Sequence, residues 1–134
     1  MNFKNQKSIF VLSKKILDKI IINSRNKLGR FRQNLHKGYT SKIQEMIIAF
    51  DKDSYVEPHY FTNKKTIFRL IKGKFLINIF YNSGKIKSKI YLKNKNDILI
   101  IPNNTIYDIK ALISKSVVHE LMDGPFNKKL FKKK

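Results

Sequence analysis

From residue 30 to residue 121 the chain is divided into short β-rich runs, with turn residues about every 8 to 12 positions. The clearest runs cover residues 43–50, 55–61, 67–71, 75–81, 86–92, 98–101, 105–111 and 116–121. Many short strands at this spacing are typical of an antiparallel barrel or jelly roll. The sequence therefore predicts an all-β fold, without reference to any particular motif.

A helix is predicted ahead of these strands, over roughly residues 14–24, with Ser13 as its N-cap. Its apolar residues recur at helical spacing, so one face should pack against the outside of a sheet. A short strand is predicted before it, at residues 9–12. Residues 30–36 give an incomplete strand signal, in which polar and apolar side chains alternate.

The turns predict how some of these strands connect. Lys72–Lys74, centred on a glycine, and residues 81–85, with Gly84, both resemble hairpin turns. Pro58 lies inside the run 55–61 and predicts an edge position or a bulge, because proline cannot donate to a strand ladder. Residues 86–92 alternate between apolar or small residues and mostly lysine, which predicts one buried and one solvated face.

Length and composition predict one domain that covers residues 1–134. We expect about residues 8–130 to be ordered and the basic ends, 1–7 and 128–134, to fray. With no cysteine the chain has no disulfide and no thiolate metal ligand, which fits a cytoplasmic protein. No apolar run approaches the roughly 20 residues needed to cross a bilayer, so we expect no membrane association.

The net charge of +20 has two explanations. It could attract a polyanion such as nucleic acid. Alternatively, it reflects the A/T-rich codons of lysine, isoleucine and asparagine, as in an A/T-rich bacterial genome. Only Arg25, Arg30, Arg32 and Arg69 among the 29 basic residues are arginines, and the lysines are spread along the chain. Because phosphate-reading sites favour arginine, we expect nucleic-acid binding to be non-specific at most.

The most informative stretch is residues 54–73, SYVEPHYFTNKKTIFRLIKG. His59 and Phe61 are two positions apart, so on a strand they share a face. Four residues separate Phe61 from Thr66, and six separate Thr66 from Gly73. This spacing resembles the first motif of the cupin superfamily, in which two histidines and a glutamate hold a divalent metal. Here phenylalanine stands at the second histidine and threonine at the glutamate.

The second cupin motif supplies the fourth ligand. Residues 102–107, PNNTIY, resemble it but place Tyr107 where that histidine is usual. Further matches narrow the resemblance to WbuC-type cupins, which are found beside surface-polysaccharide genes. These matches are at 30–36, 43–46, 54–59, 119–120 and 124–126. The resemblance covers about residues 8–130 and implies a single-domain cupin-like barrel or jelly roll with an N-terminal helix.

The resemblance also implies that His59, Phe61, Thr66 and Tyr107 face a pocket inside the barrel. Of these only His59 is an ordinary metal ligand, so we expect no metal site and no cofactor. His59 and Tyr107 are candidates for acid–base catalysis without metal. His36 and His119 are the other histidines and do not occupy cupin ligand positions.

Three hypotheses of function follow. The first is a degenerate WbuC-like cupin that binds a sugar-like or anionic small molecule. The second is an enzyme related to carbohydrate or surface polysaccharide that uses His59 and Tyr107, or a non-standard metal site. The third is a basic nucleic-acid-binding protein. Arg30, Arg32 and Arg69 could hold an anionic group, although surface charges are usually just solvated. A homodimer is a further expectation, because cupin barrels often pair through their sheets.

Overall fold

A computed structural model describes residues 9–125 and 131–133. It contains one helix and ten strands in this part of the chain. They are α1 (Lys14–Asn23), β1 (Arg30–Asn34), β2 (Ile43–Phe50), β3 (Tyr55–Phe61), β4 (Thr66–Lys72), β5 (Phe75–Phe80), β6 (Ile86–Leu92), β7 (Ile98–Ile101), β8 (Ile106–Ala111), β9 (Ser116–Asp123) and β10 (Phe131–Lys133). The predicted all-β fold is confirmed.

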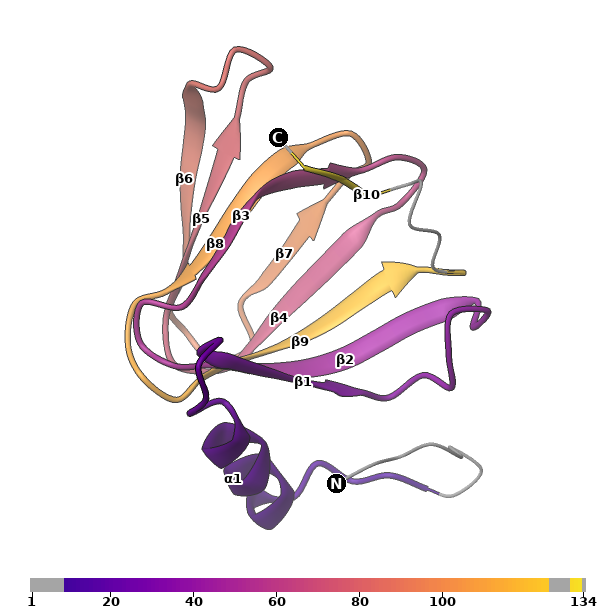
Figure 1. Ribbon diagram of the computed structural model, residues 1–134, viewed down its shortest axis with the longest axis vertical. Coiled ribbons are helices and arrows are strands. Elements are labelled where there is room, and N and C mark those ends of the chain that lie inside the picture. The colour runs from indigo at the N-terminus through magenta and orange to yellow at the C-terminus, as the bar shows by residue number, and fades with distance from the viewer. Residues whose placement is uncertain (1–8, 126–130, 134) are drawn as a thin grey trace.

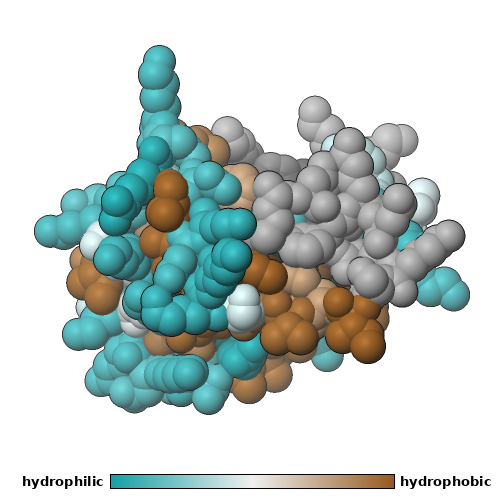
Figure 2. All heavy atoms as spheres, turned by 90° about the horizontal axis from the view of Figure 1, so that it is seen from below, coloured by the Kyte–Doolittle hydropathy of each residue, from teal (hydrophilic) through white to brown (hydrophobic). Residues whose placement is uncertain are grey.

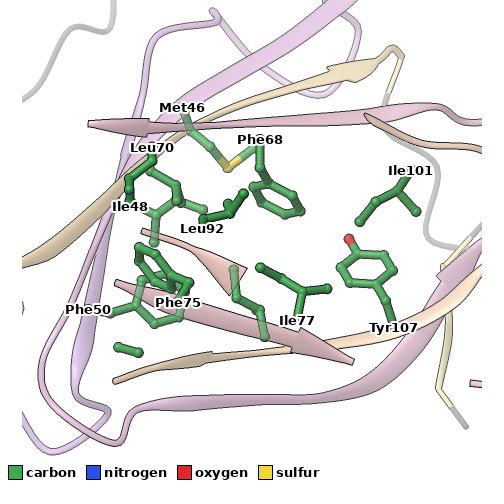
Figure 3. Close-up of a cluster of buried hydrophobic side chains, with 13 residues drawn as sticks. Met46, Ile48, Phe50, Phe68, Leu70, Phe75, Ile77, Leu92, Ile101 and Tyr107 are labelled. Carbon is green, nitrogen blue, oxygen red and sulfur yellow. The ribbon is translucent and has the colours of Figure 1, made fainter. Parts of the chain in front are cut away.

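The strands form two antiparallel sheets that face each other (Figure 1). The first sheet has the order β1-β2-β9-β4-β7, and the second has the order β10-β3-β8-β5-β6. The main core lies between them and takes side chains from both inner faces, including Phe50, Phe68, Leu70, Phe75 and Tyr107 (Figure 3). The architecture is a jelly roll, as the spacing of strands and turns predicts.

Helix α1 covers the outer face of the first sheet. Ser13 is the N-cap, and its hydroxyl accepts a hydrogen bond from the amide of Ile16 (3.3 Å). Ile20 and Ile21 are buried in a second apolar cluster against Ile47, Ala49 and Val117 of the sheet. The predicted helix is therefore confirmed, but the strand predicted at residues 9–12 is wrong, because these residues instead lead into the helix as irregular chain.

Between β2 and β9 the chain passes from one sheet to the other six times, after β2, β3, β4, β6, β7 and β8. Each of these six connections contains one residue with positive φ: Asp53, Asn63, Gly73, Asn96, Asn104 and Lys115. Glycine adopts this conformation freely, and asparagine and aspartate tolerate it better than other residues. Sharp reversals of this kind let short strands alternate between the two sheets.

Two predictions about strand pairing differ from the structure. β4 and β5 do not form a hairpin, because β4 pairs with β7 and β9 whereas β5 pairs with β6 and β8. Gly73 is thus a crossing between sheets. The buried face predicted for β6 exists only at its end, where Leu92 is buried and Ile90 packs partly against the core, while the rest of the strand is exposed. It is an edge strand, and Figure 1 shows the β5–β6 hairpin extending away from the facing sheet.

Other local predictions are confirmed. β5 and β6 pair as a hairpin through residues 81–85, with Gly84 at φ 92°. The pairing of β3 with β8 shifts register between Val56 and His59, so Pro58 lies in a bulge. Of the basic end predicted to fray, residues 131–133 instead form β10, paired with β3. Residues 1–8, 126–130 and 134 lie outside the described residues. They include the other positions that were predicted to fray, 1–7, 128–130 and 134.

The surface carries both polar and apolar residues. Figure 2 shows them interspersed on the face seen from below Figure 1. In the part of the chain that the structure describes, no helix combines the length and the apolarity needed to cross a membrane.

Candidate functional site

A cavity of about 550 Å³ takes lining side chains from β1, β2 and β3. Its walls also take side chains from β8 and β9. The volume lies within the usual range for small-molecule pockets. His59, Phe61 and Tyr107, three of the four pocket residues predicted from the sequence, line it.

Strand β1 supplies a cationic wall. Arg30, Arg32 and Asn34 line the cavity, because alternate residues of a strand share a face. The intervening Phe31 packs against the apolar cluster under α1, which fixes this orientation. Arg69, predicted from the sequence as a further possible ligand for an anion, lies elsewhere and donates from Nη1 to Oδ1 of Asn96 (2.9 Å).

The charge of Arg32 acts on Arg30. Arg30 donates from Nη1 to the main-chain oxygen of Tyr55 (3.3 Å). Burial lowers the pKa of Arg30, and the charge of Arg32 lowers it further. No hydrogen bond or ion pair joins the Arg32 side chain to another described residue. Arg30 is half-buried and Arg32 is exposed, so the two side chains present positive charge at the cavity, where an anion would lessen their repulsion.

His59 and Tyr107 are held together by strand pairing. They are directly opposite in the ladder of β3 and β8, and their ring centroids are 4.4 Å apart. The Nδ1 atom of His59 lies 2.8 Å from the main-chain oxygen of Glu57. A carbonyl only accepts, so we assign the proton to Nδ1, which leaves Nε2 as the acceptor nitrogen.

The environment sets the protonation states of this pair. Burial lowers the pKa of His59 more than the hydrogen bond to Glu57 raises it, so the ring is neutral at pH 7. Burial, and then the charge of Glu120, raise the pKa of Tyr107 well above 10, so it remains a phenol. Thr66 is buried and hydrogen-bonded to Tyr107, but it does not line the cavity.

Glu120 is a further cavity residue, and it is not among the site residues predicted from the sequence. It lies on the inner face of β9, opposite Met46 of β2 and Phe68 of β4 in the strand register. Its exposed fraction is 6%, and it lines the cavity. Burial among these apolar neighbours raises its pKa from 4.5 to about 7, although the charge of Arg32 opposes the shift. The only signal in the sequence was alternation along β9 with Val118 and Met122.

The other candidates have structural partners. Nδ1 of His36 accepts from the amide of Glu45 (3.0 Å), at the rim of the cavity. His119 alternates with Glu120 along β9, and its Nε2 pairs with Oε2 of Glu45 at 2.6 Å.

The cupin ligand positions do not fit a metal ion. Phe61 has no donor atom, and its ring packs edge-on against that of His59 with centroids 5.6 Å apart. Thr66 is a weak ligand, and Tyr107 holds its proton too tightly to be a phenolate at neutral pH. Within residues 9–125 no three histidine, aspartate or glutamate side chains are grouped as metal ligands. The donor set therefore does not match the metal centre that the fold implies.

We expect protein purified without chelator to carry far less than one equivalent of Fe, Mn, Ni or Zn by elemental analysis. Phe61→His should not raise the metal content, because Thr66 and Tyr107 still lack suitable donors. Stoichiometric metal that disappears in His59→Ala would contradict this reading of the donor set.

Glu120 should make stability depend on pH. An acid whose pKa is raised by folding loses stability as pH rises from its unfolded pKa of 4.5 to its folded pKa of about 7. The shift corresponds to about 3 kcal/mol. At pH 8 the free energy of unfolding of Glu120→Gln should therefore be about 2 kcal/mol higher than that of the parent. The gain is smaller than the full shift because burying the amide group has a cost of its own. At pH 4.5 the amide cost remains but the gain is almost gone, so the variant should be up to about 1 kcal/mol less stable than the parent.

The measurement is urea unfolding at both pH values. His59 titrates in parent and variant alike, so its contribution cancels in the comparison. Asp53→Asn is the control, because Asp53 is a surface carboxylate and asparagine tolerates its positive φ. A gain for Glu120→Gln that is the same at pH 4.5 and pH 8 would show that Glu120 does not titrate as described.

The structure is similar to several solved structures. BH2720 from Bacillus halodurans matches with a TM-score of 0.65 and 15% identity, over 90% of this chain and 85% of that one. KdgF from Halomonas sp. matches with a TM-score of 0.60 and 20% identity, over 75% and 83%. The Cnp3 cupin domain of Schizosaccharomyces pombe matches with a TM-score of 0.58 and 15% identity, over 77% and 71%.

These likenesses establish the fold. No curated protein matches the chain. Residues 12–92 match the family model described as "Domain of unknown function (DUF6016)", which covers α1 to β6 and more than half of the chain. The chain has the cupin fold and belongs to the DUF6016 family.

Proposed function

We propose that the cavity binds a small, sugar-like anion and that Arg30 and Arg32 hold its charged group. The observation that carries this proposal is the pair of arginines on the inner face of β1, in the same cavity as the buried polar groups of His59, Tyr107 and Glu120. Arginine's planar fork suits carboxylate and phosphate oxygens. In this proposal the chain is a WbuC-like cupin in which the usual metal ligands are substituted.

The rest of the cavity supports a ligand of this size and kind. Aromatic side chains of Tyr39, Phe61 and Tyr107 line it together with polar groups. Pockets for small molecules usually combine a mostly apolar lining with a few placed polar groups. A sugar ring presents both C–H faces and hydroxyl groups, which match this mixture. Against the alternative that the arginines are merely solvated charge, Arg30 is partly desolvated and both line a concave site.

The test is calorimetric titration with D-gluconate, D-glucuronate and glucose 6-phosphate, with uncharged glucose as the reference. At least one anion should bind more tightly than glucose. Arg30→Ala and Arg32→Ala should each weaken the binding of that anion about 10- to 100-fold, as expected for loss of a charge-assisted hydrogen bond.

Arg69→Ala is the matched control, since it removes the same charge outside the cavity. It should change the affinity less than about twofold after correction for ionic strength. Equal losses in Arg69→Ala and Arg32→Ala would mean that the protein attracts anions through its net charge alone, and the proposal would be withdrawn.

A second candidate function is acid–base catalysis on a carbohydrate. The close pairing of His59 with Tyr107 favours it, because a neutral imidazole and a protonated phenol can act as base and acid. Such an enzyme should exchange a substrate C–H proton with solvent deuterium. Exchange that His59→Gln and Tyr107→Phe both abolish, with binding retained, would support catalysis. Binding without any exchange would leave the cavity as a binding site only.

A further inference from the structure

An arginine and a carboxyl group face the same cavity without touching. Arg32 lines it from β1, and Glu120 lines it from β9. The charge of Arg32 lowers the pKa of Glu120, so the two groups lie within electrostatic range. Nevertheless they form no ion pair within 4.0 Å among the described residues. The space between them is part of the cavity and is available to a ligand.

Glu120 is unusual because it is buried and has no partner in the described chain. No hydrogen bond or ion pair joins its carboxyl group to another described residue, although only 6% of it is exposed. Its neighbours across the strands, Met46 and Phe68, offer no donors. The Glu120 carboxyl oxygens are not among the described side-chain atoms that are fully buried without a partner, so they open to the cavity. A polar group in such a place takes its hydrogen bonds from water or from a ligand.

We propose that Glu120 is the second recognition point of the cavity and that its ligand is a hydroxylated acid. In this arrangement Arg30 and Arg32 hold the anionic end, and a hydroxyl group of the ligand donates a hydrogen bond to the Glu120 carboxyl group. This inference rests on the proposed anion site and adds the class of ligand. It also accounts for a carboxyl group that stability alone would not favour at this position.

A hydroxyl group fits better than an ammonium group at this end. Burial favours the uncharged form of Glu120. An uncharged carboxyl group can form a hydrogen bond with a hydroxyl group, but it attracts a cation only weakly. Two arginines in the same cavity also repel a second cation. Tyr107 and His59 can hydrogen-bond further hydroxyl groups nearby. A polyhydroxy carboxylate or phosphate meets all of these conditions.

The experiment compares acids that differ in one group. The first set is propionate, 3-hydroxypropionate and 3-aminopropionate. The second set is hexanoate and D-gluconate, which are longer molecules and span a longer distance. The third set is inorganic phosphate and glycerol 3-phosphate. Dissociation constants are measured by calorimetry at pH 7 for the parent, Glu120→Leu, Glu120→Gln and Arg32→Ala. Circular dichroism and thermal melting confirm that each variant is folded, and the apolar surroundings of Glu120 favour folding of the leucine variant.

In at least one set the hydroxylated member should bind the parent about tenfold or more tightly than its counterpart without hydroxyl groups. That preference should fall below about threefold in Glu120→Leu and survive in part in Glu120→Gln, whose amide oxygen can still accept. Arg32→Ala should weaken the binding of every anion to a similar degree. Tighter binding of 3-aminopropionate than of 3-hydroxypropionate would overturn the hydroxyl assignment.

The results distinguish failure of the proposed anion site from failure of the proposed role of Glu120. If anions bind in an Arg32-dependent manner but hydroxyl groups make no difference in any set, the anion site stands and the role of Glu120 is wrong. If no anion in any set depends on Arg32, the proposed function itself is wrong, and the inference about Glu120 falls with it.

Discussion

Gly73→Ala is expected to lower the free energy of unfolding by about 3 kcal/mol or more. Gly73 crosses between the sheets with φ +87°, where an L-residue is strained by about 1–2 kcal/mol. A Cβ atom there would lie 2.2 Å from Oγ and 2.5 Å from Cα of Ser116. Ser116 is fully buried at the start of β9, so the clash cannot be relieved by moving a flexible side chain alone. Overpacking of this kind adds about 1–3 kcal/mol.

Gly84→Ala is the matched control for this substitution. Gly84 has φ +92° in the β5–β6 hairpin, but a Cβ atom there would meet nothing within 4 Å. It should cost only the strain of about 1–2 kcal/mol. The measurement is urea unfolding of both variants beside the parent. Equal losses would mean that Gly73 lies in an open hairpin turn, and the crossing between β4 and β5 would then be wrong.

Phe61→Ala is expected to cost about 3 kcal/mol, the lower end of the range for a buried phenylalanine. Phe61 has an exposed fraction of 8% and packs edge-on against His59. The lower end applies because one side of its ring borders the cavity, where fewer contacts are lost. The loss comes from removed apolar contacts, so it should be much the same at pH 6 and pH 8 in thermal or urea unfolding.

Tyr60→Ala separates this effect from general loss of an aromatic residue in β3. Tyr60 is the next residue along the strand, points to the opposite face and is only half-buried. It should cost about 1 kcal/mol, as a partly exposed site does. A Phe61→Ala variant as stable as the parent would place residue 61 in solvent, and the register of the cupin motif on β3 would have to be abandoned.

Much of the fold could be predicted because local chemistry and final structure agree. The bounds of β2 and β3 are the same, residue for residue, as those predicted from the sequence. Four of the six crossings use Asp53, Asn63, Asn96 and Asn104, residues that favour both turns and positive φ. The exception is Lys115, where the residue type gives no sign of the left-handed conformation.

Pairing between strands could not be read in the same way. A strand, a glycine turn and another strand look alike whether the chain folds back or crosses to a second sheet. At Gly73 the decision depends on the close approach to Ser116, which is 43 positions later. Likewise, alternation in β6 predicts a buried face, but burial requires a facing sheet that the projecting part of this hairpin lacks.

The candidate site was only partly accessible from the sequence. The cupin spacing placed His59 and Phe61 on one face, and alternation on β1 grouped Arg30 with Arg32. That the arginines face the cavity depends on Phe31 packing under α1, which is a tertiary contact. Glu120 escaped notice because its importance comes from Met46 and Phe68 on neighbouring strands and not from its own sequence context.

The most direct test of the central claim is an NMR titration of the arginine side chains with D-gluconate. The chain has only four arginines, Arg25, Arg30, Arg32 and Arg69, so each Nε–H resonance can be assigned from single variants. The account predicts saturable shifts at Arg30 and Arg32, with a common dissociation constant, and little change at Arg25 and Arg69. Shifts of equal size at all four arginines, or no saturable shift at Arg30 and Arg32, would contradict it.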